Sequence, residues 1–111
     1  MEEVVYDTNL LISLLKSGKR TAKGFTTMFN IIEFPKALDL EELGVICPTL
    51  DDYDESLKIS ASLLRKGEPL PAVDMLITSI CIRRGLTLQT RDKHFTRIKS
   101  VRQEFKLELI R

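Results

Sequence analysis

The stretch that decides the fold is PAVDMLITSICIRRGLTLQTRD, residues 71–92. Pro71 is suited to the first turn of a helix, and Gly85 is suited to its end. Between them, residues 72–84 have little polar surface, which predicts a helix at the centre of the protein. Residues 86–90 then form a short run of strand length. A buried helix followed at once by a strand is typical of α/β proteins with a parallel sheet.

The rest of the chain continues this alternation of strands and helices. Further strands are expected at residues 3–6, 25–29, 44–47 and 106–110, the last alternating like an edge strand. Further helices are expected at residues 10–16, from about Asn30 onwards, and from Leu50 to a stop at Gly67. Pro35 requires the helix near Asn30 to begin late or to be kinked, because proline is comfortable only in a first helical turn. The predicted class is α/β with a mostly parallel sheet.

Length and composition indicate one domain, spanning residues 1–111. The 111 residues are 43% hydrophobic and 30% charged, as in ordinary globular proteins. No apolar run approaches the roughly 18 residues that cross a membrane, and the acidic start of the chain lacks the basic region of a signal peptide. We therefore expect a cytoplasmic protein in which Cys47 and Cys81 are buried and reduced.

The charge of the chain is distributed unevenly. Residues 83–111 carry nine lysines and arginines against three acids, a net charge of +6, although the whole chain has a net charge of only +1. Such a basic end could bind nucleic acid beside an acidic pocket, or it could be an ordinary solvated surface.

Four acidic residues end or interrupt apolar segments, where acids do not pack well. They are Asp7, Glu33, Asp74 and Asp92. A carboxylate in an apolar setting costs several kcal/mol unless a cation accompanies it. No basic residue is adjacent in sequence to the first three. The simplest shared explanation is that the four acids converge on a metal ion.

The residue types favour a hard divalent cation. In parallel α/β sheets ligands bind at the carboxyl ends of strands, and Asp7 and Asp92 each follow a predicted strand. Glu33 and Asp74 lie early in helices that start near the same edge. Mg²⁺ or Mn²⁺ suits such oxygen ligands, whereas zinc is disfavoured because the chain has no cluster of histidines or cysteines. A carboxylate-held Mg²⁺ is suited to phosphodiester hydrolysis.

Each acid also has a simpler interpretation. Asp7 could be only a helix cap, and Asp74 could only stabilise a helix N-terminus through the macrodipole. Glu33 could be an exposed helix residue. Asp92 could be a turn residue paired with Arg91 or Lys93. Any one of these acids alone is weak evidence of a site, and the four together are stronger.

Four runs that contain these acids resemble the PIN domain, and most closely the VapC-type toxin ribonucleases. The runs are YDTNLLI (6–12), NIIEF (30–34), DMLITSI (74–80) and TRDKHF (90–95). They occur in the family's order and span nearly the whole chain. The resemblance implies a three-layer α/β/α fold and Mg²⁺- or Mn²⁺-dependent cleavage of single-stranded RNA. It also implies frequent homodimers and a cognate antitoxin that blocks the site.

The resemblance assigns roles to residues by their position in these runs. It assigns the metal site to Asp7, Glu33, Asp74 and Asp92. It assigns polar support for those acids to Asn9 and Thr90, with Thr8 as a further candidate. The chain departs from the family between Glu33 and Cys47, where it is short and contains Pro35.

The residues around Asp92 carry further hypotheses. His94 is either a proton donor to a leaving group or a solvated loop histidine. Arg91, Lys93 and Arg97 either contact RNA phosphates or face solvent. Phe95 is predicted to pack into the core.

The leading functional hypothesis is a metal-dependent endoribonuclease, the toxin of a type II toxin–antitoxin pair. One alternative is a catalytically weak PIN-like module that binds RNA or protein. Another is a housekeeping RNA-processing nuclease. A phosphatase is less favoured, because the chain has no nucleophilic aspartate pair and no glycine-rich phosphate loop.

Overall fold

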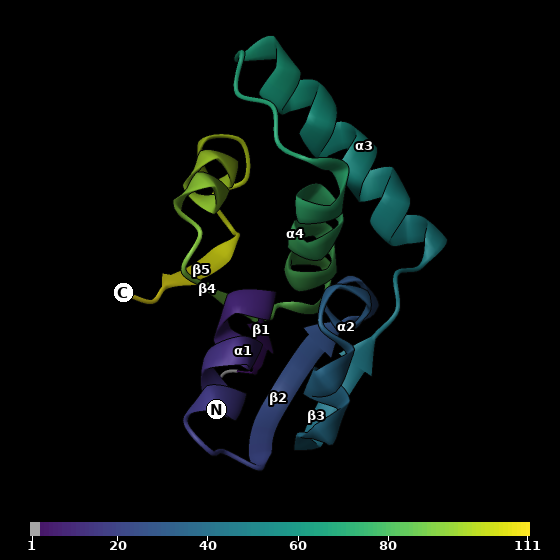
Figure 1. The fold of residues 1–111 in the computed structure, drawn as a ribbon. Coiled ribbons are helices and arrows are strands. Elements are labelled where there is room, and N and C mark those ends of the chain that lie inside the picture. The colour runs from purple at the N-terminus through teal and green to yellow at the C-terminus, as the bar shows by residue number, and fades with distance from the viewer. Residues whose placement is uncertain (1–2) are drawn as a thin grey trace.

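Five parallel strands form one sheet between two layers of helices in the computed structural model, which describes residues 3–111 (Figure 1). The strand order is β3-β2-β1-β4-β5, and every pairing is parallel. The strands are β1 (Val4–Tyr6), β2 (Thr21–Thr27), β3 (Glu41–Ile46), β4 (Thr87–Thr90) and β5 (Lys106–Leu109). This is the three-layer α/β/α architecture expected from the sequence.

Each face of the sheet is covered by its own set of helices. One face packs against α1 (Thr8–Lys16), α2 (Met28–Glu33) and the 3₁₀ helix η1 (Pro35–Asp39). The other packs against α3 (Leu50–Arg65), α4 (Ala72–Arg84) and the 3₁₀ helix η2 (Lys93–Ser100). Val5 and Leu88 of the sheet lie in this second core and are fully buried. The two cores hold the sheet rigidly, so side chains at the strand ends have fixed positions.

Helix α4 is the central helix that the sequence predicts. Seven consecutive residues, Met75 to Cys81, are buried, because the helix is packed on more than one side. Gly85 then ends the helix in the left-handed conformation, at φ 65°, which favours glycine. Strand β4 follows within two residues, so α4 and β4 form one continuous buried unit.

The region around Pro35 differs from the prediction of a late or kinked helix. Helix α2 begins at Met28, earlier than Asn30, because Thr27 and Asn30 form a reciprocal capping box. It ends at Glu33, before Pro35. Pro35 instead starts η1, where its missing N–H costs nothing. The short helix therefore accommodates the proline without a kink.

Two further expectations were wrong or incomplete. Cys47 is exposed, because β3 ends at Ile46 and leaves the thiol outside the core. Cys81 is buried as predicted, and burial raises the pKa of its thiol to about 12. Helix η2 was not predicted, although Phe95 within it packs into the core as expected. Among the described residues, no helix combines the length and apolarity required to traverse a membrane.

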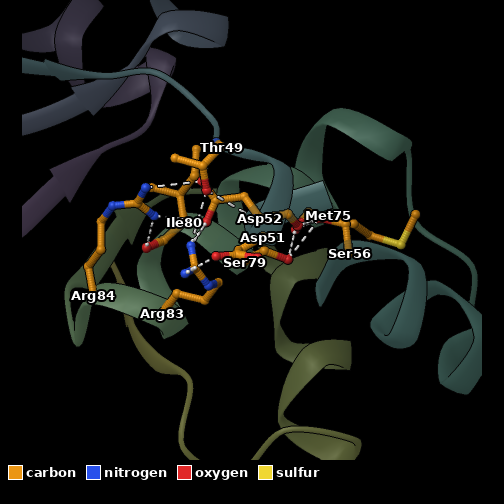
Figure 2. Close-up of polar contacts among 9 residues, drawn as sticks. All are labelled: Thr49, Asp51, Asp52, Ser56, Met75, Ser79, Ile80, Arg83 and Arg84. Carbon is orange, nitrogen blue, oxygen red and sulfur yellow. Dashed lines mark hydrogen bonds and ion pairs between the residues drawn. The ribbon is translucent and has the colours of Figure 1, made fainter. Parts of the chain in front are cut away.

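A buried ion-pair cluster fixes α3 against α4 (Figure 2). Asp52, whose side chain is fully buried, accepts hydrogen bonds from Nη1 of Arg83 at 2.8 Å and from Nη1 and Nη2 of Arg84 at 2.9 and 3.0 Å. It also accepts one from the Thr49 backbone N–H at 2.8 Å, which caps α3. Burial alone would raise the pKa of Asp52, but these donors hold the pKa well below its usual range.

We predict that Asp52→Asn lowers the free energy of unfolding by about 2 kcal/mol at neutral pH. This is less than the 3–5 kcal/mol of a fully buried pair, because both arginines remain partly exposed. The pKa of Asp52 is lower in the folded protein than its ordinary value of 3.8, so the charged carboxylate stabilises the folded state when the pH is above 3.8. This contribution is lost as the pH falls and Asp52 becomes protonated. Urea unfolding should therefore show a difference from wild type that shrinks below about pH 4. Asp39→Asn, at an exposed position, is the control and should change little.

Candidate metal centre

Three neighbouring strands end in polar residues at the same edge of the sheet. Asp7 follows β1, Thr27 ends β2, and Thr90 ends β4. Because β1 pairs with both other strands in parallel, these ends lie side by side. The Asp7 backbone N–H donates to the carbonyl of Gln89 at 2.9 Å, which locks β1 to β4 at this edge. The carboxyl edge is therefore the natural place for a site in this fold.

Asp7 is held by three hydrogen bonds to its carboxylate. Oδ1 accepts from the Thr8 backbone N–H at 2.9 Å and from Nδ2 of Asn30 at 3.0 Å. Oδ2 accepts from Oγ1 of Thr90 at 2.6 Å. Asp7 is thus the cap of α1, as the simpler interpretation has it, but it also receives donors from α2 and β4. Both carboxylate oxygens have fixed directions.

Asp74 and Asp92 lie on either side of His94. Nε2 of His94 is 2.7 Å from Oδ2 of Asp74, and Nδ1 is 2.7 Å from Oδ1 of Asp92. Asp92 also caps η2 by accepting from the His94 backbone N–H at 3.3 Å. His94 is therefore neither a solvated loop residue nor free, because both ring nitrogens contact carboxylates. Asp92 makes no ion pair with Arg91 or Lys93.

The three aspartates share one electrostatic environment. Burial raises the pKa of Asp74, the contact with His94 opposes this, and the nearby charges of Asp7 and Asp92 raise it further. Contacts connect the three residues directly, because Thr90 bonds both Asp7 and the Asp92 backbone, and His94 contacts both Asp74 and Asp92. The structure therefore brings Asp7, Asp74 and Asp92 into one network, although Asp7 is distant from the other two in sequence.

Glu33 lies at the rim of this group. It is exposed, so it is not a buried acid of the kind the apolar sequence around it suggested. Its Oε1 accepts from Oγ1 of Thr8 at 3.1 Å, and Thr8 accepts from Nδ2 of Asn30 at 3.0 Å. Glu33 also lines a cavity of about 240 Å³ together with Asp74. Thr8 and Asn30 thus connect Glu33 to Asp7.

The supporting polar residues act at different distances from the acids. Thr90 is buried, donates to Asp7, and accepts from the Asp92 backbone N–H at 3.0 Å. Asn9 contacts no acid directly. Its Nδ2 is 3.5 Å from Oγ1 of Thr90, and its Oδ1 accepts from the Arg91 backbone N–H at 3.2 Å. Thr90 therefore orients two acids, while Asn9 holds the loop that follows β4.

Asn30 is the site residue that the sequence analysis missed. It is fully buried and donates from one nitrogen to both Asp7 and Thr8. Its Oδ1 accepts from Oγ1 of Thr27 at 2.6 Å. An asparagine inside the apolar run of residues 29–32 was an available signal, because a buried amide requires partners.

The donor chemistry at this edge fits a hard divalent cation. Oδ1 of Asp74 and Oδ2 of Asp92 receive no hydrogen bond from any residue between 3 and 111, so each is available to a ligand. All the candidate donors are carboxylate oxygens, which Mg²⁺ and Mn²⁺ prefer. Within the same residues, no three acidic, histidine or cysteine side chains already stand close enough to hold an ion. The fit is therefore one of donor chemistry.

A basic cleft includes the two residues that flank Asp92 in sequence. Its volume is about 680 Å³, and it is lined by Arg91, Lys93, Leu109, Ile110 and Arg111. The three cationic side chains make no hydrogen bond or ion pair with another described residue. Arg97, by contrast, donates to the carbonyl of Pro69 at 3.0 Å. Unpaired cations beside a cluster of carboxylates are suited to binding phosphate groups.

Comparison with known proteins supports the fold. No family model and no curated protein sequence matches the chain. Solved structures match over nearly its whole length. VapBC2 from Rickettsia felis, bound to a DNA fragment from its promoter, has a chain with a TM-score of 0.77 and 18% identity, covering 96% of this chain and 97% of that one.

Two further complexes show the same likeness. DNA-bound VapBC from Salmonella typhimurium gives a TM-score of 0.77 at 21% identity, covering 97% of this chain and 98% of that one. VapBC-1 from nontypeable Haemophilus influenzae gives 0.74 at 17% identity, covering 96% of each chain. The chain therefore has a PIN-domain fold. More particularly, the fold is shared with a chain of each of these VapBC complexes.

We predict that Thr90→Val reorganises the edge while Thr90→Ser preserves it. Valine keeps the shape of threonine but leaves Asp7 and the Asp92 N–H without their shared partner, which costs about 1–3 kcal/mol. Serine keeps the hydroxyl and loses only a methyl group. Urea unfolding should therefore separate the two variants, with valine the less stable. Equal stability of the two variants would contradict the role of the hydroxyl.

Proposed function

We propose that this protein is a Mg²⁺- or Mn²⁺-dependent endoribonuclease that cleaves single-stranded RNA. The observation that carries the proposal is the network of contacts that connects Asp7, Asp74 and Asp92 at one sheet edge, with Glu33 at the rim. Carboxylates gathered at one edge favour a bound cation. An acidic centre next to a basic cleft matches a substrate whose backbone is anionic.

The chain's own residues supply binding and orientation. Asp7, Asp74, Asp92 and, at the rim, Glu33 would hold the metal. When bound, the ion lowers the pKa of water and offsets negative charge on the reacting phosphate. Thr90 and Asn30 keep the Asp7 carboxylate in one orientation, and His94 contacts the carboxylates of both Asp74 and Asp92. Arg91 and Lys93 would hold flanking phosphates of the RNA.

We further propose that the protein is the toxin of a type II toxin–antitoxin pair. Support comes first from the fold, which is shared with chains of VapBC complexes. It comes also from a similar structure described as a toxin–antitoxin complex from Klebsiella pneumoniae. That structure has a TM-score of 0.61 at 19% identity, covering 82% of this chain and 88% of that one. A cognate antitoxin is then the expected protein partner. Its binding should inhibit cleavage by the purified toxin.

We predict that Asp7→Asn and Asp92→Asn each abolish Mn²⁺-stimulated cleavage of single-stranded RNA. Each change removes a charge from the metal site while keeping the shape of the side chain. Purified variants should be compared with wild type by gel assay, with and without EDTA, and their fold checked by circular dichroism. Asp39→Asn is the matched control and should cleave normally. Unchanged cleavage in both site variants would refute the assignment.

A second function is favoured by one specific observation. His94 stands between Asp74 and Asp92, and the described acids do not form a ready cage for an ion. This arrangement is also what a catalytically weak PIN-like module would have, acting by binding RNA or protein. Calorimetric titration with Mn²⁺ distinguishes the two functions. Binding that disappears in Asp92→Asn supports the nuclease, and no binding at millimolar Mn²⁺ supports the module.

We predict that Arg91→Glu and Lys93→Glu weaken RNA binding without changing the fold. Both side chains are exposed and unpaired, so their loss costs little stability. Each should lower affinity and reduce the slope of log affinity against log salt by about one, as expected for a phosphate contact. Lys19→Glu, at the opposite edge of the sheet, is the control. Fluorescence anisotropy at several salt concentrations gives both quantities.

A further inference from the structure

The ring of His94, the only histidine in the chain, is held from several sides. Its Nε2 lies 2.7 Å from Oδ2 of Asp74, and its Nδ1 lies 2.7 Å from Oδ1 of Asp92. The ring also lies beside the fully buried ring of Phe95, with 5.1 Å between the ring centroids. The backbone N–H of His94 donates to the same Oδ1 of Asp92 at 3.3 Å. His94 therefore restrains one oxygen of each of two carboxylates.

The other two acids of the edge follow the same pattern. Oε1 of Glu33 accepts from Oγ1 of Thr8 at 3.1 Å. Oδ1 of Asp7 accepts two hydrogen bonds, from the Thr8 backbone N–H at 2.9 Å and from Nδ2 of Asn30 at 3.0 Å. Oδ2 of Asp7 accepts from Thr90 at 2.6 Å and keeps a second lone pair. Each of the four acids thus has at least one oxygen engaged by the protein.

His94 decides how Asp74 and Asp92 can act as ligands. Oδ1 of Asp74 and Oδ2 of Asp92 accept no hydrogen bond from any residue in the described range 3–111. The other oxygen of each carboxylate is in contact with the His94 ring. Turning either carboxylate to present both of its oxygens to one ion would break a 2.7 Å contact. Each aspartate is therefore restricted to a single ligand oxygen.

Divalent cations differ in the number of carboxylate oxygens that they require. Ca²⁺ takes roughly six to eight oxygen ligands in a flexible geometry, and bidentate carboxylates are common among them. Mg²⁺ demands a near-ideal octahedron and keeps several waters, so one or two carboxylates are usually sufficient. Among residues 3–111, no three acidic, histidine or cysteine side chains stand close enough to form a cage. Single oxygens from a few carboxylates therefore suit Mg²⁺ better than Ca²⁺.

We propose that His94 is a positioning residue that makes the site select Mg²⁺ over Ca²⁺. It acts through Asp74 and Asp92, by leaving each of them one oxygen for the ion. The inference deepens the proposed metal-dependent nuclease and rests on it. Without the ring, both carboxylates could turn and offer two oxygens, which is the coordination that Ca²⁺ accepts. Removing a residue that orients metal ligands typically changes metal affinity by roughly 10–100-fold.

The first test is calorimetric titration of the purified protein with Mg²⁺ and with Ca²⁺ at one pH. His94→Ala should raise the ratio of Ca²⁺ affinity to Mg²⁺ affinity by about tenfold over wild type. His94→Gln keeps one side-chain donor, so its ratio should lie between the two. A change of charge alone would move both affinities together and leave the ratio unaltered. The ratio is therefore specific to the proposed role.

Thr96→Ala is the matched control for these variants. Thr96 is exposed in the same helix η2, and its hydroxyl donates only to the carbonyl of Lys93. This variant should keep the wild-type ratio of affinities. Circular dichroism checks that each variant is folded.

A second test uses wild type alone and therefore needs no variant. Because the chain has one histidine, the ¹⁵N signals of its ring nitrogens can be assigned without ambiguity in NMR spectra. At saturating Mg²⁺ these signals should remain distinct from those of the urea-unfolded chain, since the ring stays on both carboxylates. Signals that move to the unfolded values would show that the ion displaces the ring, which overturns the proposal.

The outcomes separate this inference from the proposed function. Mg²⁺ binding by wild type with an unchanged affinity ratio in His94→Ala overturns the selectivity role and leaves the nuclease standing. No binding of either ion by wild type overturns both. A raised ratio in His94→Ala, an intermediate one in His94→Gln and a retained ring contact support both.

Discussion

The carboxylate of Asp7 is the constraint on which the arrangement of this protein depends. It receives donors from the start of α1, from α2 and from the end of β4, so one side chain connects three elements that are far apart in sequence. Each donor is itself fixed, since Asn30 belongs to the capping box of α2 and Thr90 also holds the backbone of Asp92. Thr90 and Asn30 therefore connect Asp7 to the backbone of Asp92 and, through Thr8, to the side chain of Glu33.

This arrangement concentrates negative charge at one sheet edge and compensates it only in part. Within the described residues, His94 is the side chain that contacts the carboxylates of both Asp74 and Asp92. The Asp7 carboxylate instead accepts hydrogen bonds from the uncharged side chains of Asn30 and Thr90. Elsewhere the same fold neutralises a buried acid fully, as Arg83 and Arg84 do for Asp52. The contrast is informative, because a structural acid is paired with arginine whereas the acids at the sheet edge are not, as expected for the metal site that we propose.

The local patterns were sufficient for most elements and insufficient for a few. Helix α4, strand β4 and the edge strand β5 were predicted because their burial leaves a direct pattern of apolar residues and a terminal glycine. The start of α2 was placed too late, because the capping box of Thr27 and Asn30 was not recognised. Cys47 was assigned to the core because its neighbours are apolar, but the strand ends one residue earlier.

The sequence by itself determined the α/β class, the order of the elements and the presence of acids that follow strands, because these depend on local periodicity and residue type. Only the tertiary structure decided which side chains meet. It placed Asn30 beneath Asp7, His94 between Asp74 and Asp92, and Glu33 at an exposed rim. Those contacts join residues twenty or more positions apart or, for His94 and Asp92, depend on the direction of a side chain. Periodicity carries no information about either.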